Sequence, residues 1–173
     1  AKFLQEQLAS LLNQTRLPDE LIICDDGSTD ETLVIVDDFV KLCPFTVRVF
    51  VNPYNLGSSK NFDQAIGYCT GDIIALTDQD DTWGPEKLSC IESAFIQSSD
   101  LGGVFSNAAL IDAKGVQQGR NLWSEVGFGS AKQTAIKNGH GFDVLLLGNF
   151  VTGATFAFRA SWKGLVLPVP RGW

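Results

Sequence analysis

Three closely spaced carboxylates are the residues best placed to do chemistry. Asp78, Asp80 and Asp81 follow a short apolar run at residues 73–76. Carboxylates this close repel and raise one another's pKa unless a cation or strong hydrogen-bond donors lie among them. Mg²⁺ and Mn²⁺ prefer oxygen ligands, and Mg²⁺ commonly uses one or two protein carboxylates together with water and substrate phosphates. The pattern therefore predicts a divalent-cation site with these three aspartates as candidate ligands.

An acidic turn in solvent is the alternative interpretation of the same residues. Pro85 suits the first position of a helix, and an aspartate or threonine before it suits the helix cap. Acidic turns are common, so these residues alone leave both interpretations open.

The segments that must position these aspartates alternate between strand and helix. Apolar residues at helical spacing predict helices, and short apolar or β-branched runs predict strands. The predicted helices are residues 3–14, 33–42, 60–69 and 85–97, and the predicted strands are 21–24, 47–51 and 73–76. This alternation predicts an α/β fold, with a doubly wound, Rossmann-like, mainly parallel sheet flanked by helices.

Ligands of such sheets bind at the carboxyl ends of the strands. The residues that fall at these ends are Asp25, Asp26, Asn55, Gly57, Asp78, Asp80 and Asp81. Their common position favours one acidic binding cleft over a solvated turn. Ser28, Thr29 or Asp30 can cap the helix that follows the first acidic pair.

The second half of the chain is less regular. We expect strands at residues 103–106, 109–112 and 153–159, a turn at 113–115, a mobile loop at 127–141 and a short helix at 142–147. With 173 residues the chain is long enough for one domain and marginal for two, so we expect one.

Composition excludes several classes of function. The net charge of −7 and the lack of a Lys/Arg cluster exclude nucleic acid as the main partner. Four dispersed cysteines and a single histidine argue against structural zinc and favour thiols in a reducing cytosol. No signal peptide opens the sequence, and no apolar run reaches the roughly 18 residues of a membrane helix. We expect a cytoplasmic protein, with peripheral attachment to the inner face of the membrane as an option.

Three motifs in order resemble the family 2 glycosyltransferases of GT-A fold. They are Asp-Asp-Gly-Ser-Thr-Asp at 25–30, Asn-Leu-Gly-Ser-Ser-Lys-Asn at 55–61, and Thr-Gly-Asp at 70–72 leading to Asp-Gln-Asp-Asp at 78–81. The wording Asp-Gln-Asp-Asp-x-Trp, with Val-Thr-Gly-Ala-Thr at 151–155 and Phe-Arg at 158–159, is similar to rhamnosyltransferase-type members that build bacterial surface polysaccharide. The resemblance covers nearly the whole chain.

The resemblance implies an inverting transfer of a sugar, with rhamnose as the suggested one, from a nucleotide-diphosphate donor to a glycan or lipid-linked acceptor. It implies a nucleotide-sugar-binding half at 1–100 and an acceptor-side half at 101–173. The implied metal is Mn²⁺ or Mg²⁺, held by Asp80 of the D-x-D motif with Asp78 and Asp81. The implied nucleotide-binding residues are Asp25, Asp26, Asn55, Gly57, Lys60 and Asp78. Lys60 stands where the family often has arginine, so it can meet a diphosphate only as a point charge.

The sequence departs from the family pattern at both ends. Family members open with a further strand, and they place the catalytic base, usually an aspartate, shortly beyond the segment equivalent to 170–173. The resemblance thus implies a base beyond Trp173, and the catalytic residue is unassigned, because Asp112, Glu125 and Asp143 do not match that base. We expect the missing strand's slot to be filled by rearranged chain, by residues before Ala1 or by a second copy, so a homodimer is one option.

Two other classes stay open. A catalytically incomplete fragment could still bind nucleotide and metal without turnover. The apolar run before Asp78-x-Asp80-x-Thr82 also fits haloacid-dehalogenase-like phosphatases, where the first aspartate is the nucleophile. That fold needs a later acidic pair, and none follows Asp81.

Overall fold

The computed structural model describes residues 1–169 as parts of two compact units. The first unit contains residues 1–104 and 157–169, and the second is Phe105–Phe156. The family resemblance implies a catalytic base beyond Trp173. That position, like the segment 170–173 before it, lies outside the described residues, so the structure does not test this expectation.

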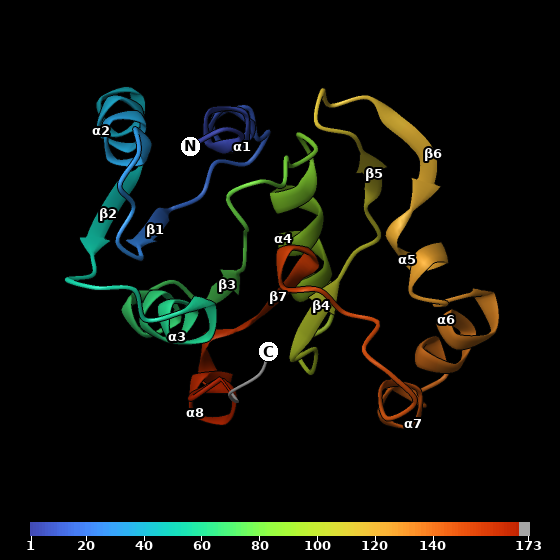
Figure 1. Cartoon of the computed structure of the whole chain (residues 1–173). Helices are drawn as coiled ribbons and strands as arrows, with labels where there is room; N and C mark the ends of the chain where they lie inside the picture. Colours follow the sequence, from blue (N-terminus) through green and yellow to red (C-terminus); the bar gives the residue numbers. More distant parts are fainter. Residues whose placement is uncertain (170–173) are drawn as a thin grey trace. The chain divides into compact units, whose positions relative to one another are not determined.

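The first unit alternates helices and strands in the predicted order (Figure 1). Its elements are α1 (Leu4–Leu12), β1 (Glu20–Asp25), α2 (Thr32–Leu42), β2 (Thr46–Val51), α3 (Ser58–Tyr68), β3 (Ile73–Ala75), α4 (Lys87–Gln97) and β4 (Gly103–Phe105). The chain returns to it through β7 (Phe156–Arg159), the 3-10 helix η2 (Ala160–Trp162) and α8 (Lys163–Val166). The predicted α/β class is confirmed, with boundaries that differ by a few residues at most.

The strands of this unit pair in two separate groups. β1 and β2 are parallel and in register from Glu20 opposite Thr46 to Asp25 opposite Val51. β7 lies between β3 and β4, and it is antiparallel to β3. The predicted sheet is therefore interrupted, because within the described residues β1 and β3 do not pair with each other. The strand predicted at 153–159 is present as β7 over its second half, whereas residues 153–155 form a 3-10 helix, and the sequence did not indicate that β7 runs antiparallel to β3.

Helix α1 packs on this framework because its apolar residues recur on one face. Leu4, Leu8 and Leu11 are spaced by four and three residues, and all three are buried with Val36 and Phe39 of α2. This spacing places them along one stripe of the helix. Their burial against α2 and the β1–β2 pair forms the main apolar core of the first unit.

The second unit is built on an antiparallel hairpin and three short helices. Its elements are β5 (Ala109–Ile111), β6 (Gln117–Asn121), α5 (Leu122–Glu125), α6 (Ser130–Lys137), α7 (Gly141–Leu145) and the 3-10 helix η1 (Gly153–Thr155). Asp112 shapes the hairpin turn, because its Oδ1 accepts hydrogen bonds from the N–H groups of Lys114 and Val116 at 2.8 and 3.0 Å. The turn predicted at 113–115 is confirmed.

The expectation of a mobile loop at 127–141 is wrong, because α6 occupies most of it. Ala135 and Ile136 pack against a buried cluster of Phe128, Val144 and Phe150, so tertiary contacts support this helix. Glycines with positive φ at 127 and 139 bound the segment, and they account for its loop-like sequence.

Strand β6 was not predicted, since Gln-Gln-Gly-Arg-Asn has no apolar alternation. Among residues 1–169, no helix combines the length and the apolar character needed to cross a bilayer.

Candidate functional site

The carboxylate of Asp25 shapes the loop after β1. Its Oδ2 accepts hydrogen bonds from the N–H groups of Gly27 and Ser28 at 3.1 and 3.0 Å, and the residue is buried. Gly27 has a φ of +83°, a conformation that favours glycine. Asp30 lies just before α2, and its Oδ1 accepts from the N–H of Thr32 at 3.1 Å. The N-cap of α2 is Glu31 without a side-chain capping bond, so the cap expected from Ser28, Thr29 or Asp30 is not formed.

Asp26 joins the loop after β1 to the loop after β2. Its carboxylate accepts hydrogen bonds from the N–H of Leu56 at 2.7 Å, the N–H of Gly57 at 2.8 Å and the side-chain amide of Asn52 at 2.9 Å. The hydrogen bond from Leu56, followed by those from Asn52 and Gly57, holds the pKa of Asp26 below its ordinary value against the opposing effect of burial. Asn55 donates to the main-chain carbonyl of Asp26 at 3.2 Å. The structure thus brings together three predicted site residues, Asp26, Asn55 and Gly57, from two strand ends.

A buried amide network fixes these loops to α3. Asn52 also donates to Oδ1 of Asn61 at 2.9 Å, and Asn61 donates to the carbonyl of Cys24 at 2.8 Å. Gln64 donates to Oδ1 of Asn52 at 3.1 Å. Lys60 lies beside this network on the exposed side of the first turn of α3. The sequence analysis did not predict a role for Asn52. Its position directly after β2, at the end of a strand, is the feature from which that role could have been predicted.

The loop after β3 carries the second acidic group. Burial raises the pKa of the half-buried Asp78, and the charges of Asp81 and Asp80 raise it further. Burial and Asp80 likewise raise the pKa of Asp81, whereas Lys87 opposes the shift. The mutual repulsion predicted for these carboxylates is therefore present.

This loop does not cap the next helix. Helix α4 starts at Lys87, and its N-cap residue is Glu86 without a side-chain capping bond. Asp81 lies five residues before Glu86, so the capping alternative does not account for the aspartates. Within residues 1–169, no three His, Cys, Asp or Glu side chains are grouped so that protein ligands alone could hold a metal. One or two carboxylates remain sufficient for Mg²⁺ if a substrate supplies phosphate ligands.

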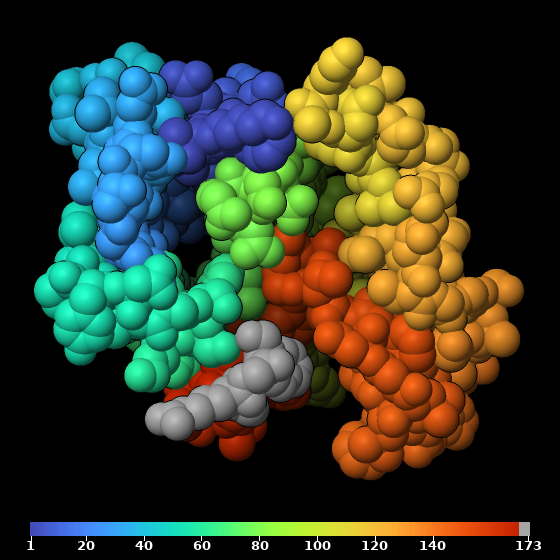
Figure 2. Space-filling model, viewed as in Figure 1, coloured from blue at the N-terminus to red at the C-terminus, as the bar shows by residue number. Residues whose placement is uncertain are grey.

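Helix α1 contacts the segment that follows β3, and Ala1, just before the helix, contacts the segment that follows β1. The nitrogen of Ala1 lies 2.8 Å from Oδ2 of Asp30, and the buried side chain of Gln7 donates to Oγ1 of Thr77 at 2.9 Å. Figure 2 shows the segment after β3, in green, against α1, in dark blue. The two acidic loops are thus contacted by α1 and by Ala1 just before it, and their union in one cleft stays a prediction.

Lys87 contributes a cation beside the acidic loop. Its Nζ lies 4.2 Å from the centre of the buried Trp83 ring, and burial lowers the pKa of Lys87 to about 8, against the opposing effect of Asp81. The indole N–H of Trp83 is buried and has no hydrogen-bond partner among the described residues. Nothing in the sequence indicated this pairing, because it depends on the path of the loop.

The titration of Lys87 makes stability depend on pH. Because its pKa is about 8 in the folded protein and 10.5 ordinarily, the unfolded chain binds more protons between these values, and stability rises with pH there. We expect a rise of about 1 kcal/mol, allowing for partial exposure, and no such rise in Lys87→Met. Urea unfolding across this pH window measures it. Lys41→Met on exposed α2 is the control, and an equal rise in wild type and Lys87→Met would contradict the assignment.

The fold is that of the GT-A glycosyltransferases, as its structural neighbours show. A mannosyltransferase from Pyrobaculum calidifontis, solved in complex with GDP-Man and Mn²⁺, superposes with a TM-score of 0.64 at 17% identity, covering 96% of this chain and 43% of that one. Residues 1–349 of TarS from S. aureus, solved in complex with UDP-GlcNAc, give 0.57 at 28% identity, covering 68% and 34%.

The chain belongs to glycosyl transferase family 2, whose family model matches residues 1–145. An uncharacterised glycosyltransferase from Nostoc sp. is 33% identical over 112 residues, covering 65% of this chain and 34% of the relative. Chondroitin synthase from Escherichia coli is 33% identical over 115 residues, covering 66% and 16%. The chain thus spans about a third or less of the length of these curated relatives.

The remaining acidic residues of the second unit have local partners. Asp112 holds the hairpin turn, Glu125 pairs with Arg120 at 3.1 Å, and Asp143 lies 3.5 Å from Nδ1 of His140. These contacts do not identify Asp112, Glu125 or Asp143 as the catalytic base. A base beyond Trp173 stays a prediction. The family is confirmed as predicted, and this match replaces the haloacid-dehalogenase alternative.

Proposed function

We propose that this chain is the donor-binding part of an inverting glycosyltransferase that uses a nucleotide-diphosphate sugar and a glycan or lipid-linked acceptor. One observation carries the proposal: Asp78, Asp80 and Asp81 crowd together after β3, and burial and mutual repulsion raise the pKa of Asp78. Carboxylates in this state are stabilised by a bound cation. The structures of two neighbours, solved in complex with GDP-Man and Mn²⁺ and with UDP-GlcNAc, support a nucleotide-sugar donor.

The aspartates fit a Mn²⁺ or Mg²⁺ ion that also binds the donor. Asp80 and Asp78 would hold it, with Asp81 as a third candidate, and the lack of a three-residue protein site among residues 1–169 leaves ligand positions for a diphosphate. A divalent ion bound there would neutralise charge on the departing diphosphate. The described residues named here would hold and orient the donor.

The loops after β1 and β2 would hold the nucleoside. Asp26 already receives three hydrogen bonds, whereas Asp25 uses only its Oδ2 for the turn. A carboxylate offers about four acceptor sites, so Asp25 retains more capacity to accept from a base or ribose. Asn55 and Gly57 line the same loop pair, and Lys60 would meet the diphosphate as a point charge.

The Asp-Gln-Asp-Asp-x-Trp motif motivates a more specific hypothesis, in which the transferred sugar is rhamnose and the donor carries deoxythymidine diphosphate. A second candidate function is nucleotide and metal binding without turnover. It is the alternative that the sequence leaves open, because Asp112, Glu125 and Asp143 do not match the family's base. A turnover assay beside a binding assay separates the two functions.

Replacing Asp80 by alanine tests the metal assignment. In the parent chain we expect Mn²⁺ to tighten the binding of UDP or dTDP at least about tenfold, because the diphosphate completes the ion's ligands. We expect Asp80→Ala to abolish this coupling and to leave thermal stability unchanged, since the residue is exposed in a loop. Calorimetric titrations with and without Mn²⁺ measure it.

Asp37→Ala is the matched control, because it removes the same charge from the exposed face of α2. It should retain the coupling. Equal diphosphate affinity with and without Mn²⁺ in the parent chain would count against a metal-assisted donor site.

A further inference from the structure

Three polar side chains along α1 and the turn after it contact the segment that carries the second acidic loop. We call Gln7, Ser10 and Gln14 the α1 stripe, because their spacing by three and four residues places them along one side of the helix. Gln7 and Gln14 are only 3% and 5% exposed, although glutamine is mostly a surface residue. Burying an amide is costly unless it is hydrogen-bonded, so the partners of these side chains indicate what the stripe does.

The stripe holds the chain on both sides of the acidic loop at residues 78–81. On the β3 side, Nε2 of Gln7 donates to Oγ1 of Thr77 at 2.9 Å. On the α4 side, the N–H of the buried Trp83 donates to Oγ of Ser10 at 3.0 Å. The three aspartates of the loop therefore lie between two attachments to the same helix.

Gln14 adds two bonds at the start of α4. Its Nε2 donates to the carbonyl of Gly84 at 2.8 Å, and its Oε1 accepts from the N–H of Leu88 at 3.1 Å. Helix α4 makes no side-chain capping bond at Glu86, so Gln14 supplies an acceptor for one of its first N–H groups. Both bonds would break if this end of the loop moved away from α1.

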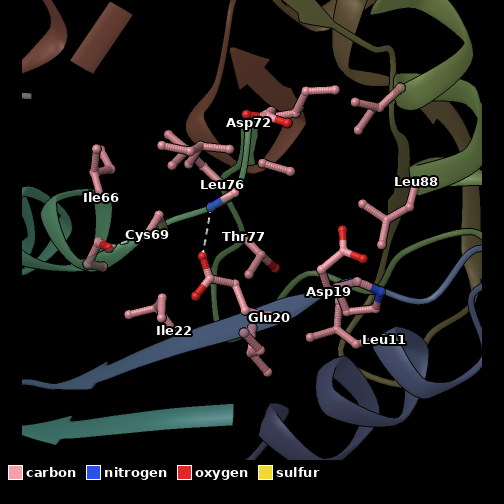
Figure 3. Close-up of a pocket in the computed structure, with 18 of the residues that line it drawn as sticks. Leu11, Asp19, Glu20, Ile22, Ile66, Cys69, Asp72, Leu76, Thr77 and Leu88 are labelled. Carbon is pink, nitrogen blue, oxygen red and sulfur yellow. Dashed lines mark hydrogen bonds between the residues drawn. The ribbon is translucent and has the colours of Figure 1, made fainter. Parts of the chain in front are cut away.

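Packing holds the same segment less firmly, because one side of it borders a cavity. The cavity has a volume of about 300 Å³, and Figure 3 shows Leu11 of α1, Thr77 and Leu88 around it. Side chains that line a cavity lose part of their packing contacts. Within residues 1–169, the carboxylates of Asp78 and Asp81 accept no hydrogen bond. The position of the backbone therefore sets where these carboxylates lie.

We propose that Gln7, Ser10 and Gln14 are positioning residues for the divalent cation of the donor site, an inference that rests on the proposed function. Groups that bind a ligand must be held within about 0.5 Å of the binding geometry. The stripe joins α1 to the chain before and after the acidic loop, so it limits the arrangements that the loop can take before the ion binds. Less order is then lost on binding, and the affinity for the ion with its diphosphate is higher.

Breaking the hydrogen bond between Gln7 and Thr77 tests the proposal. In Gln7→Met and in Thr77→Val we expect Mn²⁺ to tighten the binding of UDP or dTDP by less than about threefold, against at least about tenfold in the parent chain. Affinity without Mn²⁺ should stay within about twofold, because the loops after β1 and β2 are unchanged. The double variant should lose no more than either single variant, since both changes remove the same bond. Calorimetric titrations with and without Mn²⁺ measure these affinities.

Two control variants separate positioning from stability. Gln5→Met makes the same change on the exposed face of α1 and should retain the parent's coupling. Val36→Ala removes two methyl groups from the buried core side of α2, so it should lower Tm at least as much as Gln7→Met and still retain the coupling. If Gln7→Met does not fold, Thr77→Val, which exchanges a hydroxyl for a methyl group, carries the same test.

Three results would overturn the inference. Coupling that persists in Gln7→Met and in Thr77→Val would overturn it alone and would leave the donor site as proposed. An equal loss of coupling in Val36→Ala would assign the effect to general destabilisation rather than to positioning. A parent chain without coupling would overturn the metal-assisted donor site together with this inference.

Discussion

Replacing Glu20 by glutamine will lower the free energy of unfolding by about 2 kcal/mol near pH 7. The Glu20 side chain is 16% exposed, and its carboxylate accepts hydrogen bonds from Oγ1 of Thr70 and the N–H of Gly71, each at 3.0 Å, and also from the N–H of Thr70. Arg48 of β2 donates to it at 2.8 Å. One carboxylate thus ties β1, β2 and the turn before β3, and glutamine offers only one oxygen to these donors.

The loss from Glu20→Gln will depend on pH in a defined direction. Burial would raise the pKa of Glu20, but the hydrogen bonds from Thr70, Arg48 and Gly71 outweigh it and lower the pKa from 4.5 to about 2. The stabilisation is therefore fully present above pH 4.5 and is lost as the pH falls toward 2. The difference between the two proteins should shrink through this window.

Urea unfolding at several pH values measures the effect of Glu20→Gln. Glu92→Gln is the matched control, because Glu92 pairs with Arg16 at 3.1 Å with its side chain 40% exposed. Such a pair contributes less than about 0.5 kcal/mol. An effect of Glu20→Gln no larger than this control, or one independent of pH, would show that Glu20 does not hold the three segments together.

Replacing Asp26 by alanine will destabilise the chain by about 2–3 kcal/mol. The change removes the shared acceptor of Leu56 and Gly57 N–H groups and leaves the Asn52 amide, which is 7% exposed, without that partner. Because these donors are partly buried, leaving them unsatisfied costs more than the loss of an exposed contact. Asp26→Asn should cost less, since it retains one carbonyl oxygen.

Thermal and urea unfolding check the Asp26 series, with Asp37→Ala as the surface control expected to change stability by less than about 0.5 kcal/mol. If Asp26→Ala kept full stability but lost nucleotide affinity, Asp26 would be a ligand residue rather than a link between loops. A loss of both would agree with a loop whose shape the nucleotide site requires.

Local patterns were sufficient for most of the first unit. Leu4, Leu8 and Leu11 share one helical face, and the short apolar runs before Asp25 and Asp78 end at polar loops. These features are local, because helix and strand periodicities extend over only a few residues. The same reasoning failed at α6, where flanking glycines suggested a loop and the aromatic cluster that supports the helix was not visible in its sequence.

The candidate site could be located from the sequence but not described by it. Carboxylates at strand ends identified both acidic loops, because parallel strands present their carboxyl ends at one edge. The sequence did not show that the Asp26 carboxylate serves Leu56 and Gly57, about thirty residues farther along the chain. Nor did it show that Lys87 lies over Trp83 beside the second loop.

By itself the sequence determined the α/β class, the order of elements through α4 and the family resemblance that the family model confirmed. Tertiary structure alone decided that β7 enters between β3 and β4 and that it runs antiparallel to β3. The physical reason is the range of the interactions. Side-chain periodicity depends on neighbours along the chain, so it can be recognised in a short stretch of sequence. Strand pairing and hydrogen bonds between loops join residues that are far apart in the sequence, and no short stretch indicates which partner each will have.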